Sequence, residues 1–248
     1  MSGLSRWLLW SMCLVCLPAC QVSAQALHRG HDMNEHMDDD ATYYKVSLDR
    51  LEWRPGGDES ALAWNAKAWV GKDFNRLYLR SDGESVNGTA THAAVEGFWL
   101  HPVSRWWNLA VGLRQDLRPD PARSWLALGA VGLAPYRVAV EATAYLATGG
   151  RTALRLEAEY DLLLTNRLVL QPRVELNAYG QGDRLRDTGS GLSSAEAGLR
   201  LRYELRREIA PYVGLAWART FGATADMARA AGREAGDLQA VAGLRAWF

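Results

Sequence analysis

The sequence predicts an all-β protein, a transmembrane antiparallel β-barrel of about 12 strands that follows a short disordered N-terminal tail. Three observations support this fold class. From about residue 42 to the end, segments of about ten residues alternate apolar and polar side chains, as strands do. The connections between these segments are alternately long and short. The last segment ends on an aromatic residue, Phe248.

The first element is a secretory signal peptide. Arg6 precedes an apolar run over residues 7–19, and small residues allow cleavage after Ala24 or, as a second choice, after Ala26. The run is too short to remain as a membrane-spanning helix. We therefore assign residues 1–24 to the signal peptide.

All three cysteines, Cys13, Cys16 and Cys20, lie within that signal peptide. The exported chain is therefore expected to contain no thiol and no disulfide. A rival interpretation is that Leu17-Pro18-Ala19-Cys20 is a lipoprotein cleavage box, which would make Cys20 the lipidated first residue. The cleavage sites downstream favour the first interpretation.

The second element, residues 25–41, is a tail rich in His, Met and acidic residues. Its candidate metal ligands are His28, His31, Asp32, Met33, His36 and Met37. Imidazole binds copper in both oxidation states, thioether favours Cu(I), and carboxylate adds tolerance for Cu(II). Because no cysteine is left to complete a zinc site, the set favours copper ions. The alternative is a solvated acidic leader in which these side chains are incidental.

The third element, residues 42–248, is the predicted barrel. Strands are expected at residues 42–54, 61–70, 74–82, 89–100, 105–116, 123–133, 136–147, 151–163, 167–179, 191–205, 210–220 and 237–248. Long connections are expected at 54–60, 83–88, 117–122, 180–190 and 222–236, with a tighter turn at 149–150. Short ones are expected near 71–73, 101–104, 134–135, 164–166 and 206–209.

This alternation predicts where the barrel lies. Outer-membrane barrels have short periplasmic turns and longer extracellular loops, and an even number of strands places both ends of the barrel on the periplasmic side. We expect the outer membrane of a Gram-negative bacterium, with its lipid around the barrel and the tail in the periplasm. Tryptophans near strand ends fit aromatic girdles: Trp53, Trp69, Trp99, Trp106, Trp107, Trp125 and Trp247.

Charged side chains share one face of the expected strands. They are Arg80, Asp82, Glu96, Arg114, Asp116, Glu141, Arg155, Glu157, Glu159, Asp161, Arg173, Glu175, Glu196, Arg200, Arg202 and Glu204. In a membrane barrel this face lines the lumen. A three-residue turn centred on Thr165 would set Arg155 opposite Glu175 and Glu157 opposite Arg173. We favour a structural charge network over a substrate path.

Two function classes are disfavoured. Lys plus Arg and Asp plus Glu both number 28, so net charge gives no reason to expect a nucleic-acid partner. A lipid hydrolase would need Ser and His on the outer wall, but His92 falls on the lumen face and His101 in a short turn. We expect no enzymatic activity.

Several long motifs carry a family resemblance. They are "LDRLEWR" (48–54), "WVGKDFNRLYLRSDGE" (69–84), "LAVGLRQDLRP" (109–119) and the runs over 132–180 and 189–232. Together they closely resemble the outer-membrane copper resistance protein B family over residues 48–248. The resemblance implies a barrel from a copper resistance and homeostasis system, a copper-binding periplasmic segment and a periplasmic multicopper oxidase as a common companion.

One departure from that family is plain in the tail. Family members often carry long Met-Asp-His repeats, whereas this chain has one short cluster, "HDMNEHM" (31–37). We therefore expect a copper-binding outer-membrane protein of small capacity, whose barrel anchors the tail or exports copper. The alternative function is a small-solute, porin-like channel with an incidental tail.

Overall fold

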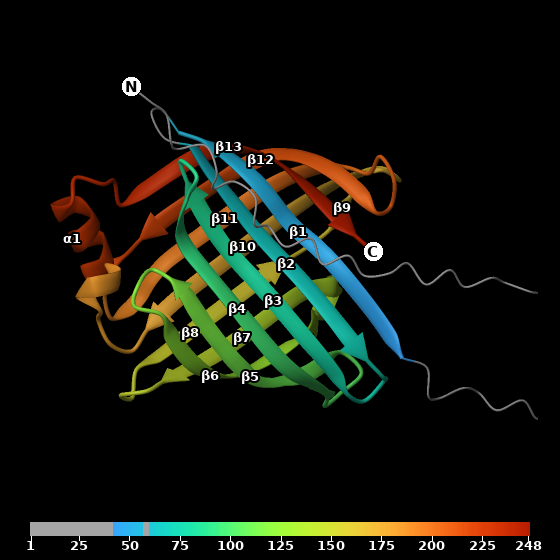
Figure 1. Cartoon of the computed structure of the whole chain (residues 1–248). Helices are drawn as coiled ribbons and strands as arrows, with labels where there is room; N and C mark the ends of the chain where they lie inside the picture. The colour runs from blue at the N-terminus through green and yellow to red at the C-terminus, as the bar shows by residue number, and fades with distance from the viewer. Residues whose placement is uncertain (1–41, 57–59) are drawn as a thin grey trace, which may run out of the picture. The chain divides into compact units, whose positions relative to one another are not determined.

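The computed structural model describes residues 42–56 and 60–248, which form an antiparallel β-barrel (Figure 1). The strands are β1 (Tyr43–Pro55), β2 (Ser60–Gly71), β3 (Arg76–Val86), β4 (Thr89–Pro102), β5 (Trp107–Arg118), β6 (Arg123–Ala134), β7 (Val138–Ala147), β8 (Thr152–Glu159), β9 (Leu162–Leu163), β10 (Leu168–Tyr179), β11 (Gly191–Tyr203), β12 (Ile209–Thr220) and β13 (Gly236–Trp247). Three short helices lie between strands: η1 (Pro135–Arg137), η2 (Arg184–Arg186) and α1 (Gly222–Ala230). The predicted all-β class is confirmed.

The barrel closes without a free edge. Neighbours in sequence pair around the ring, β13 pairs with β1, and β10 pairs with β11. Strands β8 and β9 both pair with β10 and are two pieces of one strand, interrupted at residues 160–161. The ring therefore has twelve strands, the predicted number.

The first and the last residues of the barrel both lie at the end that carries the short turns. Tyr43 at the start of β1 pairs with Gly71, just before the β2–β3 turn. At the C-terminus, the Val46 N–H donates to Phe248 O at 2.9 Å and the Phe248 N–H donates to Val46 O at 2.8 Å. The opposite end carries the β10–β11 and β12–β13 connections with η2 and α1 (Figure 1).

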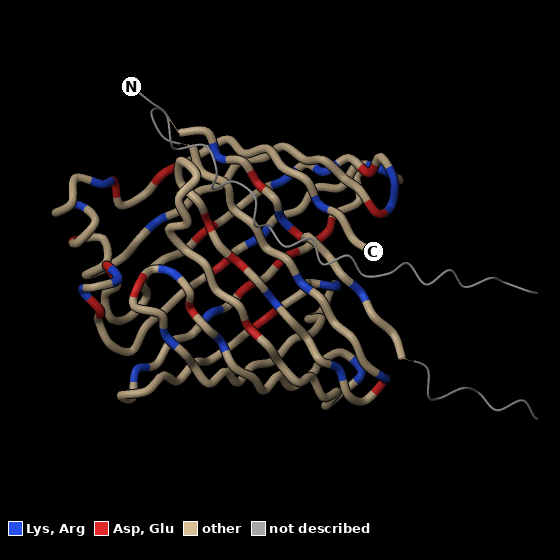
Figure 2. Tube along the Cα trace, in the orientation of Figure 1, with Lys and Arg blue, Asp and Glu red and all other residues tan. Residues whose placement is uncertain are grey.

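The barrel is apolar outside and charged inside. Outward leucines and valines are exposed along the strands, for example Leu113, Leu126, Leu128, Leu154 and Val213. Charged residues of both signs lie close together across the barrel (Figure 2), and most of those on the inward face are buried. This inversion is the arrangement that a lipid environment requires.

The tryptophan girdle forms only in part. Trp53, Trp99, Trp106 and Trp247 are exposed, as interfacial residues are. Trp125, predicted as a girdle residue, is 5% exposed and lies in the lumen instead, where its Nε1 donates to Asp116 Oδ2 at 2.8 Å. The girdle prediction is wrong for Trp125 because its neighbour Ser124, and not Trp125, faces outward at this strand end.

Two connections are shorter than predicted. The loop expected at 83–88 is a two-residue turn, because β3 continues to Val86 and both Asn87 and Gly88 have positive φ. An Asn-Gly pair with two positive φ angles makes the turn that best matches strand twist. His101 lies in the last residues of β4, where its Nδ1 donates to the Phe74 carbonyl at 3.1 Å, and not in the turn.

The 222–236 connection, predicted as a loop, contains helix α1. Its alanine-rich sequence favours a helix, and Gly232, with φ +73°, ends it. The Arg233 N–H donates to Ala228 O and the Gly232 N–H to Arg229 O, which is a Schellman cap. None of the helices in the described ranges is long and apolar enough to cross a bilayer.

The predicted register of the β8–β10 hairpin is wrong by one turn position. Glu175 lies opposite Glu157 and Asn177 opposite Arg155, so the hairpin is centred on Asn166. The cause is Thr165, whose Oγ1 accepts hydrogen bonds from the backbone N–H groups of Arg167 (3.3 Å) and Leu168 (2.9 Å). This side-chain turn makes Thr165 the first turn residue and not the central one.

The inverted barrel predicts a depth-dependent penalty for charge on its outer face. Leu113 at the middle of β5 is 61% exposed, and Leu117 lies on the same face near the strand end. We expect Leu113→Arg to lower the free energy of unfolding in phospholipid vesicles by about 2–4 kcal/mol, against about 0–1 for Leu117→Arg. Urea titration measures both. Equal effects from the two variants would contradict a membrane-embedded outer wall.

Candidate functional site

The six candidate metal ligands of the tail lie outside the described residues. Within residues 42–56 and 60–248, no group of three His, Cys, Asp or Glu side chains is placed to hold a metal ion. The chemistry that the structure does place is the charge network of the lumen and the pocket at one mouth of the barrel.

Glu96 of β4 is the centre of one half of the network. Its carboxylate is 0% exposed and accepts hydrogen bonds from Arg80, from Arg114 Nη1 at 3.0 Å and from the Tyr145 hydroxyl at 3.1 Å. The cluster contains residues of β3, β4, β5 and β7, because every second residue of each strand faces inward. The buried charge is therefore fully hydrogen-bonded, which is the condition for tolerating it.

Glu52 of β1 is the centre of the other half and is also 0% exposed. It accepts hydrogen bonds from Arg200 Nε (2.7 Å), Arg54 Nε (2.9 Å) and the Tyr212 hydroxyl (3.3 Å). Glu52 and Arg54 are not among the lumen residues that the sequence predicts. The signal was present, since Arg50, Glu52 and Arg54 alternate with Leu51 and Trp53.

The four residues proposed as a lumen charge network come together on β8 and β10. Arg155 Nη2 lies 3.3 Å from Glu175 Oε2, and Arg173 Nε lies 3.0 Å from Glu157 Oε1. Because of the shifted register these ion pairs are diagonal and not directly opposed. Arg173 Nη2 also binds Glu175 at 2.6 Å, which compensates for the two glutamates that the register places face to face.

The network also crosses the lumen between strands that are not neighbours. Arg155 of β8 binds Asp82 of β3 at 3.0 Å, and Lys67 of β2 binds Glu141 of β7 at 2.7 Å. Each pair spans five positions of the strand order. Side chains that bridge opposite walls fill the middle of the lumen and hold the walls at a fixed separation.

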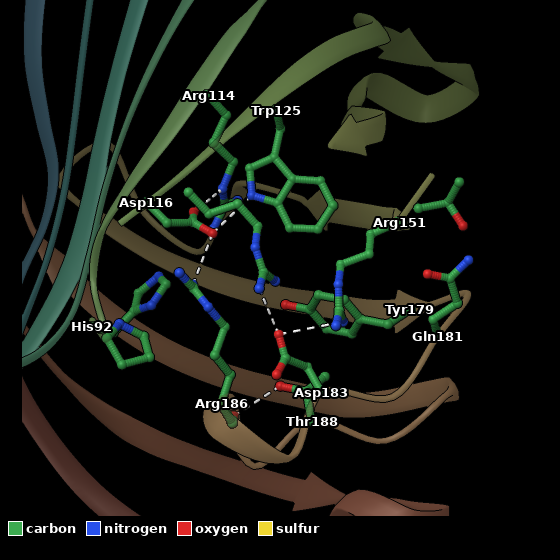
Figure 3. Close-up of a pocket in the computed structure, with 13 residues that line it drawn as sticks. His92, Arg114, Asp116, Trp125, Arg151, Tyr179, Gln181, Asp183, Arg186 and Thr188 are labelled. Atoms are coloured by element: carbon green, nitrogen blue, oxygen red, sulfur yellow. Dashed lines mark hydrogen bonds and ion pairs between the residues drawn. The ribbon is translucent and has the colours of Figure 1, made fainter. Parts of the chain in front are cut away.

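A pocket lies at the mouth that carries the longer connections, between β5, β6, β10 and η2 (Figure 3). Its volume is about 120 Å³. Among its lining residues are His92, Arg114, Asp116, Arg123, Trp125, Arg151, Tyr179, Asp183 and Arg186. His92 Nε2 lies 3.3 Å from Asp82 Oδ2, so it belongs to the edge of the lumen network.

The β10–β11 connection closes one side of this pocket through two charged contacts. Asp183 Oδ2 accepts from Arg123 Nη2 at 2.7 Å, and Arg186 Nη1 donates to Asp116 Oδ2 at 3.1 Å. Burial alone would raise the pKa of the Asp183 carboxyl, but the hydrogen bond and charge of Arg123, with Arg151 beyond it, lower that pKa below its ordinary value. The connection is therefore held in the mouth by ion pairs.

Helix α1 packs against the same connection. Thr224 Oγ1 accepts from the Gly189 N–H at 2.7 Å and lies 2.8 Å from Ser193 Oγ. A Cβ atom at Gly189 would lie 2.6 Å from the Thr224 backbone nitrogen, so only glycine allows this approach. The two longest connections thus form one layer over the mouth.

Comparison with known proteins gives consistent matches. The family described as "Copper resistance protein B precursor (CopB)" matches residues 42–248. A copper resistance protein B homolog of Pseudomonas syringae pv. tomato is 46% identical over 231 residues, 93% of this chain and 78% of the relative. Copper resistance protein B of Escherichia coli is 47% identical over 210 residues, 85% of this chain and 71% of the relative.

Among solved structures, the NanC porin has a TM-score of 0.56 with 12% sequence identity. The match covers 81% of this chain and 98% of the porin. At that identity the similarity is one of fold, and it supports the closed barrel described above.

The buried ion network predicts a large effect for loss of one central charge. Glu96→Gln leaves Arg80 and Arg114 without their shared carboxylate, and we expect about 3–5 kcal/mol less stability in urea unfolding. Asp226→Asn is the matched control, because its ion pair with Arg229 is exposed on α1 and contributes at most about 0.5 kcal/mol. A Glu96→Gln effect as small as that of the control would contradict the network.

The Asp183 contact predicts a specific pH dependence. Because its folded-state pKa lies below the unfolded value of about 3.9, Asp183 stabilises the folded protein fully above that pH, and the contribution is lost as pH falls through the folded-state pKa. We expect the difference in unfolding free energy between the native chain and Asp183→Asn to stay constant from about pH 7 to 5. It should shrink below about pH 4, whereas a difference that grows on acidification would refute the assignment.

Proposed function

The chain belongs to the copper resistance protein B family, and from this premise we propose that it binds copper ions at the outer membrane as part of a copper resistance and homeostasis system. The observation that carries the proposal is the family match over the whole barrel, residues 42–248. Copper is the substrate of this system and not a resident cofactor of the barrel.

Copper capture is assigned to the tail. Its proposed ligands are His28, His31, Asp32, Met33, His36 and Met37. Neutral imidazole and thioether groups within ten positions offer both Cu(I) and Cu(II) a suitable donor set. One short cluster corresponds to a small number of ions.

The barrel is proposed to anchor that tail and not to conduct solutes. Glu52, Glu96 and Arg80 lie in the middle of the lumen and are at most 2% exposed. Conduction would require these hydrogen-bonded charges to separate inside the barrel, which is costly for buried ion pairs. This filling of the lumen disfavours the alternative, a small-solute channel with an incidental tail.

The tail is proposed to lie in the periplasm. Strand β1 begins at the end with the short turns, which in outer-membrane barrels is the periplasmic side. In that compartment the tail would meet copper before it reaches the cytoplasm. A periplasmic multicopper oxidase is the proposed partner, since such an enzyme would act on the same ion in the same space.

The proposed site is tested by metal content of the purified full-length protein. Replacing His31, Met33, His36 and Met37 together by alanine should lower bound copper to a small fraction of that of the native chain, because both donor types are removed. Replacing Asp38, Asp39 and Asp40 by asparagine is the control, and it should leave most of the copper bound. Unchanged copper content in the alanine variant would contradict the tail assignment.

Copper content of the purified protein is also measured as a function of pH. Protonated imidazole does not bind a metal, so copper content should fall as pH decreases through about 6.5, the ordinary range of histidine. Heat-dependent gel migration of each variant reports whether the barrel remains folded. A pH-independent copper content in a folded barrel would exclude histidine as a ligand.

A further inference from the structure

The mouth pocket carries more positive than negative charge. Four guanidinium groups line it, from Arg114, Arg123, Arg151 and Arg186, against the carboxylates of Asp116 and Asp183. Asp116 binds both Arg114 (2.6 Å) and Arg186 (3.1 Å), and Asp183 binds both Arg123 (2.7 Å) and Arg151 (3.4 Å). Each carboxylate of the pocket is therefore shared by two guanidinium groups, which leaves the lining positively charged.

Arg186 is the most buried of these four guanidinium groups. Its side chain is 9% exposed, with Nη1 on Asp116 and Nη2 on the Pro121 carbonyl. Its buried Nε–H has no hydrogen-bond acceptor among the described residues. Burial lowers the pKa of the Arg186 guanidinium, and the charge of Arg123 acts in the same direction. Other arginines of the barrel, such as Arg80 and Arg155, also have one buried nitrogen without an acceptor, so the positive lining of the pocket and not this donor is what favours a ligand here.

The remaining donors are also only partly used. Arg151 Nη1 lies 3.4 Å from Asp183 Oδ2, a longer contact than the 2.7 Å that Arg123 makes to the same oxygen. Figure 3 shows Arg151 and Arg186 approaching the cavity from different elements, and Tyr179 also lines it. The Tyr179 hydroxyl makes no hydrogen bond to the residues that the structure describes, although it borders the cavity.

We propose that this pocket binds a small oxyanion of the phosphate or sulfate class, held by Arg186 and Arg151 as the charged donors with Tyr179 beside them. Guanidinium groups match the oxygen geometry of such anions with two parallel N–H donors. The volume of about 120 Å³ holds several water molecules and therefore accepts a tetrahedral ion. The site is separate from copper capture, since a cation would meet repulsion here.

Binding would also affect the β10–β11 connection. Arg186 belongs to η2, and Arg151 precedes β8, so one anion would join the connection to the barrel wall. This would add to the existing Asp183 and Asp116 contacts and leave them in place. The oxyanion therefore acts as a further tie across the mouth.

The test is equilibrium dialysis of the purified full-length protein in detergent against labelled inorganic phosphate at pH 7 and constant ionic strength. We expect saturable binding of one phosphate per chain, competed by sulfate and not by chloride. Arg186→Gln and Arg151→Gln should each weaken the binding at least about tenfold, as loss of a charged hydrogen bond does. Arg151→Gln keeps the test decisive if Arg186→Gln misfolds, because the Arg151 contact is the weaker one.

The matched control is Arg229→Gln. Arg229 lies on α1 at the same end of the barrel, is exposed, and its loss changes the net charge by the same amount. It should bind phosphate as the native chain does. Absence of saturable phosphate binding, equal competition by chloride, or equal loss in Arg229→Gln would each overturn the proposal, because they would reduce it to nonspecific attraction.

Discussion

The whole structure depends on neutralising charges that have been removed from water inside the barrel. The apolar side chains of the strands are exposed on the outer face, so the charged side chains are left to the lumen. Glu52 and Glu96 each lie at the centre of a cluster in which two arginines and a tyrosine hydroxyl supply donors. Removing one member of such a cluster leaves a buried charge uncompensated. This lowers stability more than replacing the whole cluster by well-packed apolar side chains would. The clusters therefore fix which residues of each strand face inward and how far apart the walls stand.

A filled lumen is the reason why the proposal assigns copper binding to the tail and anchoring to the barrel. A twelve-stranded ring is too wide to be packed by ordinary apolar side chains, and long arginines that reach across it are one solution. Because Arg155 and Lys67 each contact a strand on the far wall, the barrel is braced and not hollow. Ion binding is therefore proposed only outside the filled part of the lumen. The proposed places are the tail, with its His and Met side chains, and the mouth pocket, where arginines outnumber carboxylates. The two proposed sites would bind ions of opposite sign.

Much of the barrel could be predicted from the sequence because the period-two alternation of apolar and polar side chains is a local property of each strand. The strand count and the inward position of residues such as Arg80 and Glu96 followed from it. The hairpin register did not, because it depends on how the Thr165 side chain caps its own turn. Trp125 was placed on the wrong side because aromatic residues near strand ends suit both an interface and a pocket. The alanine-rich sequence of α1 does favour a helix locally, but its packing against the β10–β11 connection and the Arg186 contacts depend on residues far apart in the sequence.

The central claim is that the lumen is closed by its own ion pairs and that the barrel supports copper binding without acting as an open pore. Conductance of the purified full-length protein in planar lipid bilayers tests this claim most directly. The account predicts membranes that carry the folded protein and show no steady conductance above background, with or without copper, at moderate voltage. A wide, steady conductance that is independent of copper would contradict it and would support the porin-like alternative.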